Sequence, residues 1–400
     1  MNNPSLDIEK IKERISYYVL SNMQNESSPD DEKLKEIIAN VISEDNLSSH
    51  LSLQSKRELA MSVFNSLRRL DVIEPLMQDP SITEIMVNGH KEIFFERGGK
   101  LYKSNIKFKD SNTLQTIISC FFANSNRPLN EANPIADLRL PDGSRANAVL
   151  PPIAPDGPII TIRKFTGIRH DIATLIKQNF ISEEAARFLC DCVRNKKTIF
   201  LCGGTGSGKT TFLNTLSSFI PEDERVITIE DSLELNLQGI KNLVRLEARL
   251  PGPDGNGEIN IGDLIRSALR MRPDRIIVGE VRGTESADMM HALNTGHPGS
   301  MCTGHANSCH EMLERLSGMI MAGSSLPFDA IQAQLSMGID LIIHITRNRT
   351  GKRYIDEICY VHSSHKDGFD LENLYINKGG DNLERICCIE RLEEISAYKS

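Results

Sequence analysis

Tryptophan is absent from the 400-residue chain, and no apolar run approaches the roughly 18 residues that a membrane-spanning helix requires. Basic residues are outnumbered, 46 against 54 acidic ones, so the formal net charge is −8. A broadly basic surface for nucleic acid is therefore not expected. The opening residues Met1–Pro4 lack the pattern of a signal peptide. These absences favour a soluble intracellular protein of two or three domains, for which any membrane association is peripheral.

The nine cysteines contain no pair of C-x-x-C units. Their closest spacings are Cys190-x-Cys192 and Cys387-Cys388. Neither a disulfide framework nor a structural zinc site is indicated by such spacings. We expect buried, reduced thiols instead.

Residues 1–70 show the spacing of three amphipathic helices. In the second helix, Ser28 and Pro29 supply a cap and a first-turn proline, and apolar residues recur at i, i+3, i+4, i+7 and i+8. The apolar stripes of the three helices are Ile8, Ile11 and Ile15; Leu34, Ile37, Ile38, Val41 and Ile42; and Leu59, Val63, Leu67 and Leu70. The pattern predicts a helical bundle, which is compatible with a role as a docking arm.

The rest of the chain divides into two regions of different pattern. Residues 71–165 hold short alternating strands broken by turns, which indicates an α+β domain with an antiparallel sheet. Residues 166–175 include Gly167 and have no strong periodicity, so we expect a hinge there. From 176 to 400, strands alternate with helices as in an α/β nucleotide-binding domain, followed by a C-terminal extension with one expected strand at 370–376.

A glycine-rich loop lies between an apolar strand at 198–202 and a helix-compatible stretch at 211–219. The loop has the pattern G-x-x-x-x-G-K-[ST], whose backbone N–H groups converge on phosphate oxygens at the positive end of the following helix. Lys209 can reach the β- and γ-phosphates, and the hydroxyl of Thr210 can bind Mg²⁺. The sequence therefore predicts ATP and Mg²⁺ as cofactors, with nucleotide-binding residues Gly203, Gly204, Thr205, Gly206, Ser207, Gly208, Lys209, Thr210 and Thr211.

Two further strands of this region end in carboxylates. The strand at 225–229 runs into Glu230, and the strand at 275–278 runs into Gly279 and Glu280. Because ligands lie at the carboxyl ends of parallel strands, we expect both acids near the phosphates. Glu230 is predicted to position the attacking water, and Glu280 to serve the Mg²⁺ shell with Thr210, directly or through water. Glycine stands at 279, where many P-loop enzymes carry a metal-facing Asp, so Glu280 is the Walker B acid.

Next along the chain come Gly296–Ser300 and Thr303–Ser308, each with a histidine. With the phosphate loop and the acidic segments 229–235 and 275–280, they resemble in order and spacing the ATPases of type II and type IV secretion and type IV pilus machinery. The run 269–283, with upstream segments 79–89, Arg127-Pro128, 142–145 and 162–164, most resembles the CpaF-type ATPases of tight-adherence (Flp) pilus assembly. The resemblance covers about residues 70–362.

This resemblance implies a PAS-like domain, a RecA-like ATPase domain and a homo-hexameric ring. It also implies catalytic roles for His305 and for Arg145 and Arg163, whose side chains would reach the nucleotide phosphates from the first domain. The work of the ring would be delivered to inner-membrane platform proteins from the cytoplasmic face of that membrane. The chain has neither a tetracysteine zinc module nor a retraction-motor signature.

Three alternatives to this motor remain. One is a type IV secretion ATPase of another branch. Another is a soluble P-loop kinase or regulator, which would be monomeric and would phosphorylate an acceptor. The last is a nucleic-acid translocase with DNA-stimulated, strongly salt-dependent hydrolysis, which the acidic charge balance disfavours.

Overall fold

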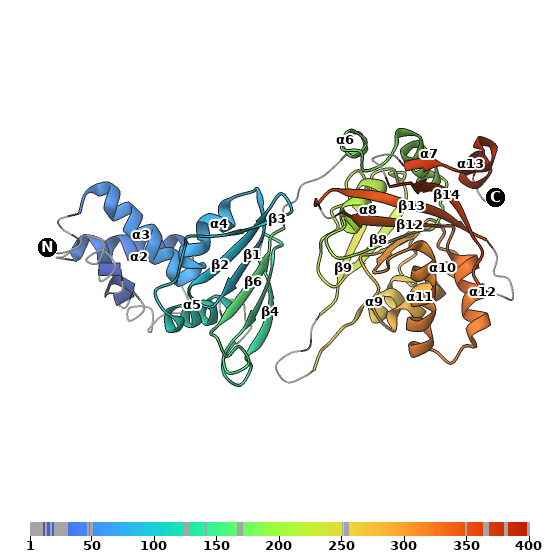
Figure 1. The fold of residues 1–400 in the computed structure, drawn as a ribbon. Coiled ribbons are helices and arrows are strands. Elements are labelled where there is room, and N and C mark those ends of the chain that lie inside the picture. Colours follow the sequence, from blue (N-terminus) through green and yellow to red (C-terminus); the bar gives the residue numbers. More distant parts are fainter. Residues whose placement is uncertain are drawn as a thin grey trace. The chain divides into compact units, whose positions relative to one another are not determined.

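The computed structural model describes residues 11, 12, 14–16, 18, 19, 31–45, 48, 51–123, 129–140, 142–165, 171–249, 251, 256–348, 350–362, 368–379 and 383–397 (Figure 1). The chain forms two compact units, Met1–Thr166 and Gly167–Ser400. Five residues of the expected hinge, 166–170, lie outside the described residues, as do Arg127 and Pro128. The remainder of that hinge leads into helix α6 (Ile172–Lys177), which the side chain of Asp171 caps. The domain boundaries proposed from the sequence stay a prediction.

The helices at the start of the first unit bury most of the predicted stripes. Helix α2 spans Asp31–Glu44 and helix α3 spans Leu53–Arg68, with Ser52 as its cap. They share a core with the helical residues near position 15, made of Ile11, Ile15, Val19, Leu34, Ile38, Ile42, Leu59, Val63 and Phe64. Leu70 lies beyond the end of α3 and packs instead into the core of the following sheet. Ile8 lies outside the described residues.

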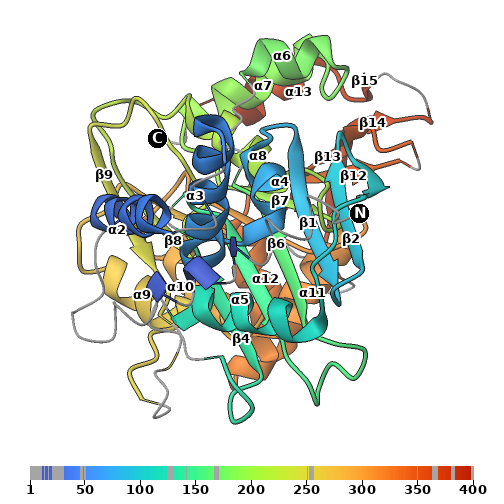
Figure 2. The ribbon, with the colours of Figure 1, turned by 90° about the vertical axis from the view of Figure 1, so that its left-hand side faces the viewer.

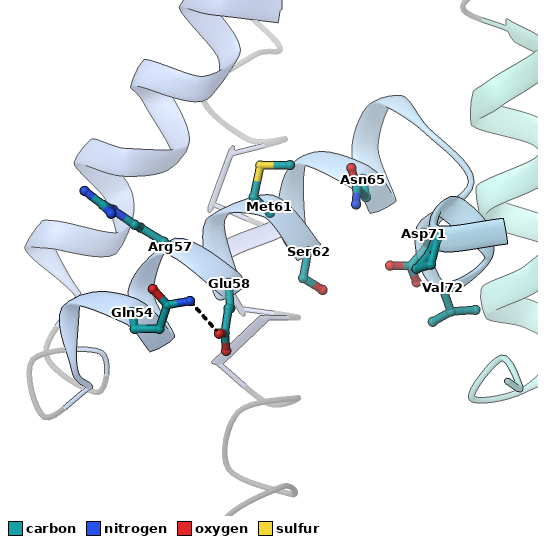
Figure 3. Close-up of a pocket in the computed structure, with 9 residues that line it drawn as sticks. Gln54, Arg57, Glu58, Met61, Ser62, Asn65, Asp71 and Val72 are labelled. Atoms are coloured by element: carbon teal, nitrogen blue, oxygen red, sulfur yellow. Dashed lines mark hydrogen bonds between the residues drawn. The ribbon is translucent and has the colours of Figure 1, made fainter. Parts of the chain in front are cut away.

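A hollow of about 420 Å³ lies along α3 and the short elements after it, η2 (Asp71–Ile73) and α4 (Glu74–Gln78) (Figure 3). Its lining mixes charged, polar and apolar side chains: Gln54, Arg57, Glu58, Met61, Ser62, Asn65, Asp71, Val72 and Pro75. Gln54 donates a hydrogen bond to Glu58 across one turn of α3 (2.9 Å), so part of this lining is already satisfied.

The first unit also contains a six-stranded antiparallel sheet in the order β3-β2-β1-β6-β5-β4. Figure 2 labels its strands β1, β2, β4 and β6. Its strands are β1 (Ile82–Asn88), β2 (Glu92–Arg97), β3 (Lys100–Lys103), β4 (Ile135–Arg139), β5 (Arg145–Val149) and β6 (Ile159–Arg163). Helix α5 (Ser111–Ala123) contributes Leu114, Ile117, Ile118 and Phe122 to the core on one face of this sheet. The antiparallel sheet of short strands expected between residues 71 and 165 is confirmed.

The second unit is built on a nine-stranded mixed sheet in the order β15-β14-β13-β12-β7-β11-β10-β8-β9. The six strands from β12 to β9 are parallel, and the other three add to them as antiparallel neighbours. The strands are β7 (Ile199–Gly203), β8 (Arg225–Glu230), β9 (Asn242–Glu247), β10 (Arg275–Val278), β11 (Met301–Gly304), β12 (Leu341–Arg347), β13 (Arg353–Val361), β14 (Leu371–Asn377) and β15 (Leu383–Arg385). This confirms the expected α/β class for the second unit.

Helices cover both faces of this sheet (Figure 1). Side chains alternate along β7, so Ile199 and Leu201 join one core while Phe200 and Cys202 join the other. The first core takes residues from α7 (Glu183–Arg194), α8 (Lys209–Ser217) and α13 (Ile389–Ser396). The second takes residues from α9 (Ile261–Ala268), α10 (Glu285–Asn294), α11 (Cys309–Gly323) and α12 (Phe328–Gly338). A central strand covered on both faces must be apolar throughout, as β7 is.

The C-terminal extension is more ordered than the sequence indicated. The strand expected at 370–376 is β14, one residue later. The sequence did not suggest β15 or α13, whose Leu392 and Ile395 pack into the first core. These elements complete one edge of the sheet and the helix layer beside it. Among the described residues, no helix is long and apolar enough to span a bilayer.

All nine cysteines are free. Six of them are buried, as expected, but Cys120 and Cys388 are exposed and Cys387 is half-buried, so the expectation is wrong for the two exposed thiols. The ligand atoms of Cys309, Glu357 and Cys359 lie within 4.8 Å of one another. The thiol of Cys309 donates to the carbonyl of Ile342 (3.4 Å), and that of Cys359 to Asn373 Oδ1 (3.0 Å). Because metal ligation requires thiolates, these contacts describe a hydrogen-bonded thiol cluster in the core rather than a metal site.

Candidate nucleotide-binding site

The glycine-rich loop lies where the pattern placed it, between the fully buried β7 and the first turn of α8. Glycine is required at 203, because an ideal Cβ there would lie 2.1 Å from the carbonyl oxygen of Ile345 on β12. Gly208 caps α8 in a left-handed conformation (φ 102°) that favours glycine. The hydroxyl of Ser207 is buried and has no hydrogen-bond partner among the described residues. The loop is therefore locked to the sheet at one end and opens into a helix N-terminus at the other.

Lys209, the first residue of α8, is buried against this loop. Its ammonium group donates to the carbonyl oxygens of Gly203 (2.9 Å) and Gly204 (3.0 Å). It also lies 3.4 Å from Nδ1 of His305. Since an ammonium group only donates, Nδ1 of His305 is the acceptor of this contact. Thr210 and Thr211, half-buried, follow in the same turn.

His305 joins the loop lysine to the second predicted acid. Nε2 of His305 lies 2.7 Å from one carboxylate oxygen of Glu280, and Arg282 donates to the other oxygen at 2.7 Å. Partial burial and the nearby charge of Lys209 lower the pKa of His305, whereas Glu280 raises it. A neutral imidazole can accept from Lys209 at Nδ1, while its Nε2 lies close to Glu280 Oε1 without the alignment of a hydrogen bond, so this carboxylate oxygen has no hydrogen-bond partner among the described residues. Lys209, His305, Glu280 and Arg282 thus form one continuous polar chain.

Glu230 ends β8 and has a different environment. It is 2 % exposed, and one carboxylate oxygen accepts from the backbone N–H groups of Glu234 (2.7 Å) and Leu235 (2.8 Å). Its other oxygen, Oε1, is buried and has no partner among the described residues. Burial raises the pKa of Glu230 to about 7, against the opposing effect of the two N–H donors. A carboxyl group with that pKa can take up or release a proton near neutral pH.

Gly279 makes room for this carboxyl group. An ideal Cβ at 279 would lie 3.0 Å from Cγ of Glu230, tighter than side chains normally tolerate. The carbonyl oxygen of Gly279 also accepts from the hydroxyl of Thr303 on β11 (2.6 Å), which ties the strand end to its neighbour. Packing against Glu230 therefore favours glycine at 279.

The strand that carries Glu280 is anchored at its start by a buried ion pair. Arg275, which has no exposed surface, donates to both carboxylate oxygens of Glu224 (2.5 and 3.0 Å) and to the carbonyl oxygen of Val193 (2.6 Å). Such a pair, bonded on both partners, fixes geometry more than it adds stability. His297, the first histidine of the segment, contacts the carbonyl of Ala292 through Nδ1 (3.1 Å) and lies in a loop after α10.

These donors suit a magnesium nucleotide. Loop N–H groups at a helix N-terminus, a buried lysine and a threonine hydroxyl match phosphate and metal chemistry. Oxygen ligands are what Mg²⁺ prefers, and it keeps several waters, so Thr210 and Glu280 could hold it only in part. The buried, unpartnered Oε1 of Glu230 and hydroxyl of Ser207 are further polar atoms in the residues of this site.

Arg145 and Arg163 lie in the first unit, directly opposite each other on β5 and β6. Arg139 of β4 lies opposite Arg145 in turn, so three arginines form a row across three strands. Residues opposite each other in an antiparallel pair lie on one face of the sheet. Sequence reasoning had identified two members of this row but not Arg139. Their expected role at the nucleotide stays a prediction.

Two arginines that the sequence did not single out lie beside the loop itself. An ideal Cβ at Gly206 would lie 3.6 Å from Nη1 of Arg347, and one at Gly208 would lie 3.6 Å from Cδ of Arg353. They stand at the end of β12 and the start of β13. The available signal was a pair of basic residues flanking the turn Asn348–Lys352.

Comparisons with known proteins identify the family of this chain. The profile of the type II/IV secretion system protein family matches residues 67–380. A provisionally named conjugal transfer protein of Mycobacterium tuberculosis is 35% identical over 72% of this chain and 83% of its own length. Type IV secretion system protein VirB11 of Brucella suis is 33% identical over 73% of this chain and 89% of its own length.

Solved structures share the fold at lower identity. The ATPase DotB of Legionella pneumophila aligns with a TM-score of 0.51 and 22% identity over 71% of this chain and 78% of its own. The pilus retraction motor PilT with bound ADP aligns with a TM-score of 0.51 and 19% identity, over 82% of this chain and 86% of its own.

Proposed function

This chain belongs to the family of type II/IV secretion system proteins and is an ATPase, and we propose that it is the Mg²⁺-dependent motor of a pilus-assembly or protein-secretion machine. The observation that carries the proposal is the polar chain from Lys209 through His305 to Glu280 beside the phosphate loop. It links Lys209, which follows β7, to an acid that follows β10, by way of His305, which follows the strand between them, β11.

The residues of the site divide the chemistry of hydrolysis. The loop N–H groups and Lys209 bind the β- and γ-phosphates and counter the charge that builds on them. Glu230, with a pKa of about 7, can orient the attacking water and accept its proton. When bound at Thr210 and Glu280, Mg²⁺ would neutralise phosphate charge. Arg282 and His305 hold the carboxylate of Glu280 in place.

We further propose a homo-hexameric ring in which a PAS-like first unit and a RecA-like second unit close on ATP and open on ADP. Arg145 and Arg163 would complete the site from the first unit, and Arg139 extends the same row. The ring would act at the cytoplasmic face of the inner membrane on platform proteins. The CpaF-like segments favour the tight-adherence pilus branch. The amphipathic N-terminal helices, with the hollow along α3, are the proposed docking arm.

Phosphate release by the purified chain tests the proposal, with Lys209→Ala as the decisive variant. Removing the only lysine of the loop should lower kcat at least about 100-fold. Lys177→Ala, an exposed lysine on α6, is the matched control and should keep wild-type activity. Hydrolysis should stop in EDTA and should not respond to DNA, and mass photometry with ATP should show hexamers. Activity of Lys209→Ala within a few-fold of wild type would contradict the assignment.

A further inference from the structure

The hairpin of β12 and β13 is packed against the phosphate loop. The carbonyl oxygen of Ile345 on β12 lies so close to Gly203 that no side chain fits between them. Beyond this contact, the guanidinium of Arg347 lies beside Gly206, and the side-chain stem of Arg353 lies beside Gly208. The hairpin end thus flanks the same loop from which Lys209 projects.

The two arginines face each other across the ladder. Arg347 pairs with Arg353 in the register of β12 and β13, so both side chains leave the same face of the hairpin. Like charges directly opposite each other destabilise a sheet. A register shift between His344 and Ile345 lies just before this pair. Such irregularities re-aim side chains and are frequent next to functional sites.

Hydrogen bonds connect the described residues of the turn that joins the strands. Asn348 Oδ1 accepts from the backbone N–H groups of Thr350 and Lys352 and from the hydroxyl of Thr350, at 2.7 to 3.0 Å. The backbone N–H of Asn348 donates to the carbonyl of Lys352 (2.9 Å), and Gly351 supplies the left-handed conformation the turn needs (φ 88°). These hydrogen bonds offset the electrostatic repulsion between the two guanidinium groups in the chain without ligand.

We propose that Arg347 and Arg353 are nucleotide-binding residues that contact the phosphates held by the loop 203–210. The inference rests on the proposed function and extends its site by two cations from the same unit as Lys209. A polyphosphate is the ligand that fits, because it carries several negative charges and matches the fork of donors on arginine. Bound phosphate removes the repulsion between the two guanidinium groups, so binding and hairpin stability are coupled.

Nucleotide titrations of the full chain test this assignment. Kd for fluorescent ATP, ADP and AMP analogues is measured for wild type, Arg347→Ala, Arg353→Ala and the double variant. Each single change should raise Kd for ATP and ADP about tenfold, the loss of about 1.4 kcal/mol expected for one charge-assisted hydrogen bond. The affinity for AMP should change less than about twofold.

Lys352→Ala is the matched control. It removes the same charge from the same hairpin, but Lys352 lies in the turn, outside β13 and outside the register pair of Arg347 and Arg353. Its affinities should equal those of wild type. The melting temperature without nucleotide should not fall in either arginine variant, because a like-charge pair is being relieved.

The possible outcomes distinguish a failure of this assignment from a failure of the proposed ATPase function. Weakened ATP and ADP binding with an unchanged melting temperature supports the assignment. Wild-type affinities in both arginine variants, or equal losses for AMP and ATP, overturn it while the ATPase assignment stands. A purely structural hairpin would show a lower melting temperature with unchanged Kd, which also overturns it. A wild-type chain that binds none of the nucleotides overturns both.

Discussion

A glutamate carboxyl group lies at the end of β8 and another at the end of β10, and the two differ in burial and in their hydrogen-bond partners. Glu230 is almost fully buried, accepts from two backbone N–H groups and has no cation in hydrogen-bond contact among the described residues. Glu280 is 19% exposed and lies between Arg282 and His305. Burial raises the pKa of Glu230 to about 7, whereas the carboxylate of Glu280 accepts a charge-assisted hydrogen bond from Arg282.

The comparison teaches how neighbouring strands of one sheet provide two kinds of acid. A proton acceptor works best when its pKa lies near the working pH, which describes Glu230. A metal-shell or charge-balancing carboxylate works beside cations, and the contact of Glu280 with Arg282 fits the role proposed for it. The sequence had assigned these roles from position alone. Their environments now give each role a physical reason, and the following experiments test the difference.

The largest expected effect is on the rate of hydrolysis. Glu230→Gln should lower kcat at least about 100-fold while leaving Kd for Mg-ATP within a few-fold, because the amide cannot accept a proton. Glu280→Gln should instead weaken the Mg²⁺-dependent part of ATP binding, because the neutral amide offers no negative charge to the metal or to Arg282. Titrations of a fluorescent ATP analogue with Mg²⁺ and with EDTA, beside phosphate-release rates, measure both. Equal losses of binding in the two variants would contradict the division of roles.

A smaller effect is expected on stability as a function of pH. The pKa of Glu230 rises from 4.5 to about 7 on folding, so the folded state binds its proton more tightly than the unfolded state. Its contribution is therefore complete below about pH 4.5 and is lost as the pH rises through about 7, a change of about 3 kcal/mol. Glu230→Gln cannot titrate and should keep that stability.

Melting temperatures of wild type and Glu230→Gln at several pH values check this. The melting temperature of the variant should rise steadily relative to that of wild type between about pH 5 and about pH 8. Glu280→Gln is the control. It breaks the pair with Arg282, so its melting temperature should lie below that of wild type at every pH measured. A constant difference between wild type and Glu230→Gln across this range would mean that Glu230 is already ionised at low pH.

Local patterns predicted most of this site, and tertiary contacts account for what they missed. The loop, Glu230 and Glu280 follow strands whose apolar runs are readable in the sequence. Arg347 and Arg353 could not be predicted from the sequence. They lie beside the loop only because β12 pairs with β7, which is more than 130 residues away along the chain. Arg282 lies within the run 269–283, but its contact with Glu280 depends on the backbone turn after β10.

The same limit applies to the C-terminal extension and to the arginine row. The tail has no strong apolar periodicity, so β15 and α13 depend on an edge and a core supplied by the rest of the second unit. Arg139 joins Arg145 and Arg163 only through strand register. A one-residue slip would move any of them to the other face, and no single-sequence pattern fixes register that closely.

Gly279 offers the last and smallest test of the contrast between the two acids. Its substitution by alanine places a methyl group about 3.0 Å from Cγ of Glu230. The buried carboxyl must then shift from its two N–H donors, so Gly279→Ala should lower kcat about tenfold and cost about 1–3 kcal/mol of stability. Glu280, on the other side of the same strand end, should keep its contacts, and Mg²⁺-dependent binding should be unchanged.

A double-mutant cycle isolates this packing effect. In a Glu230→Ala background the side chain that the new methyl group would meet is gone, so Gly279→Ala should cost little further stability. Melting temperatures of the four proteins in the cycle give the coupling between the two positions. A penalty for Gly279→Ala that is the same with and without the Glu230 side chain would show that glycine is needed at 279 for another reason, such as the backbone acceptor it presents to Thr303.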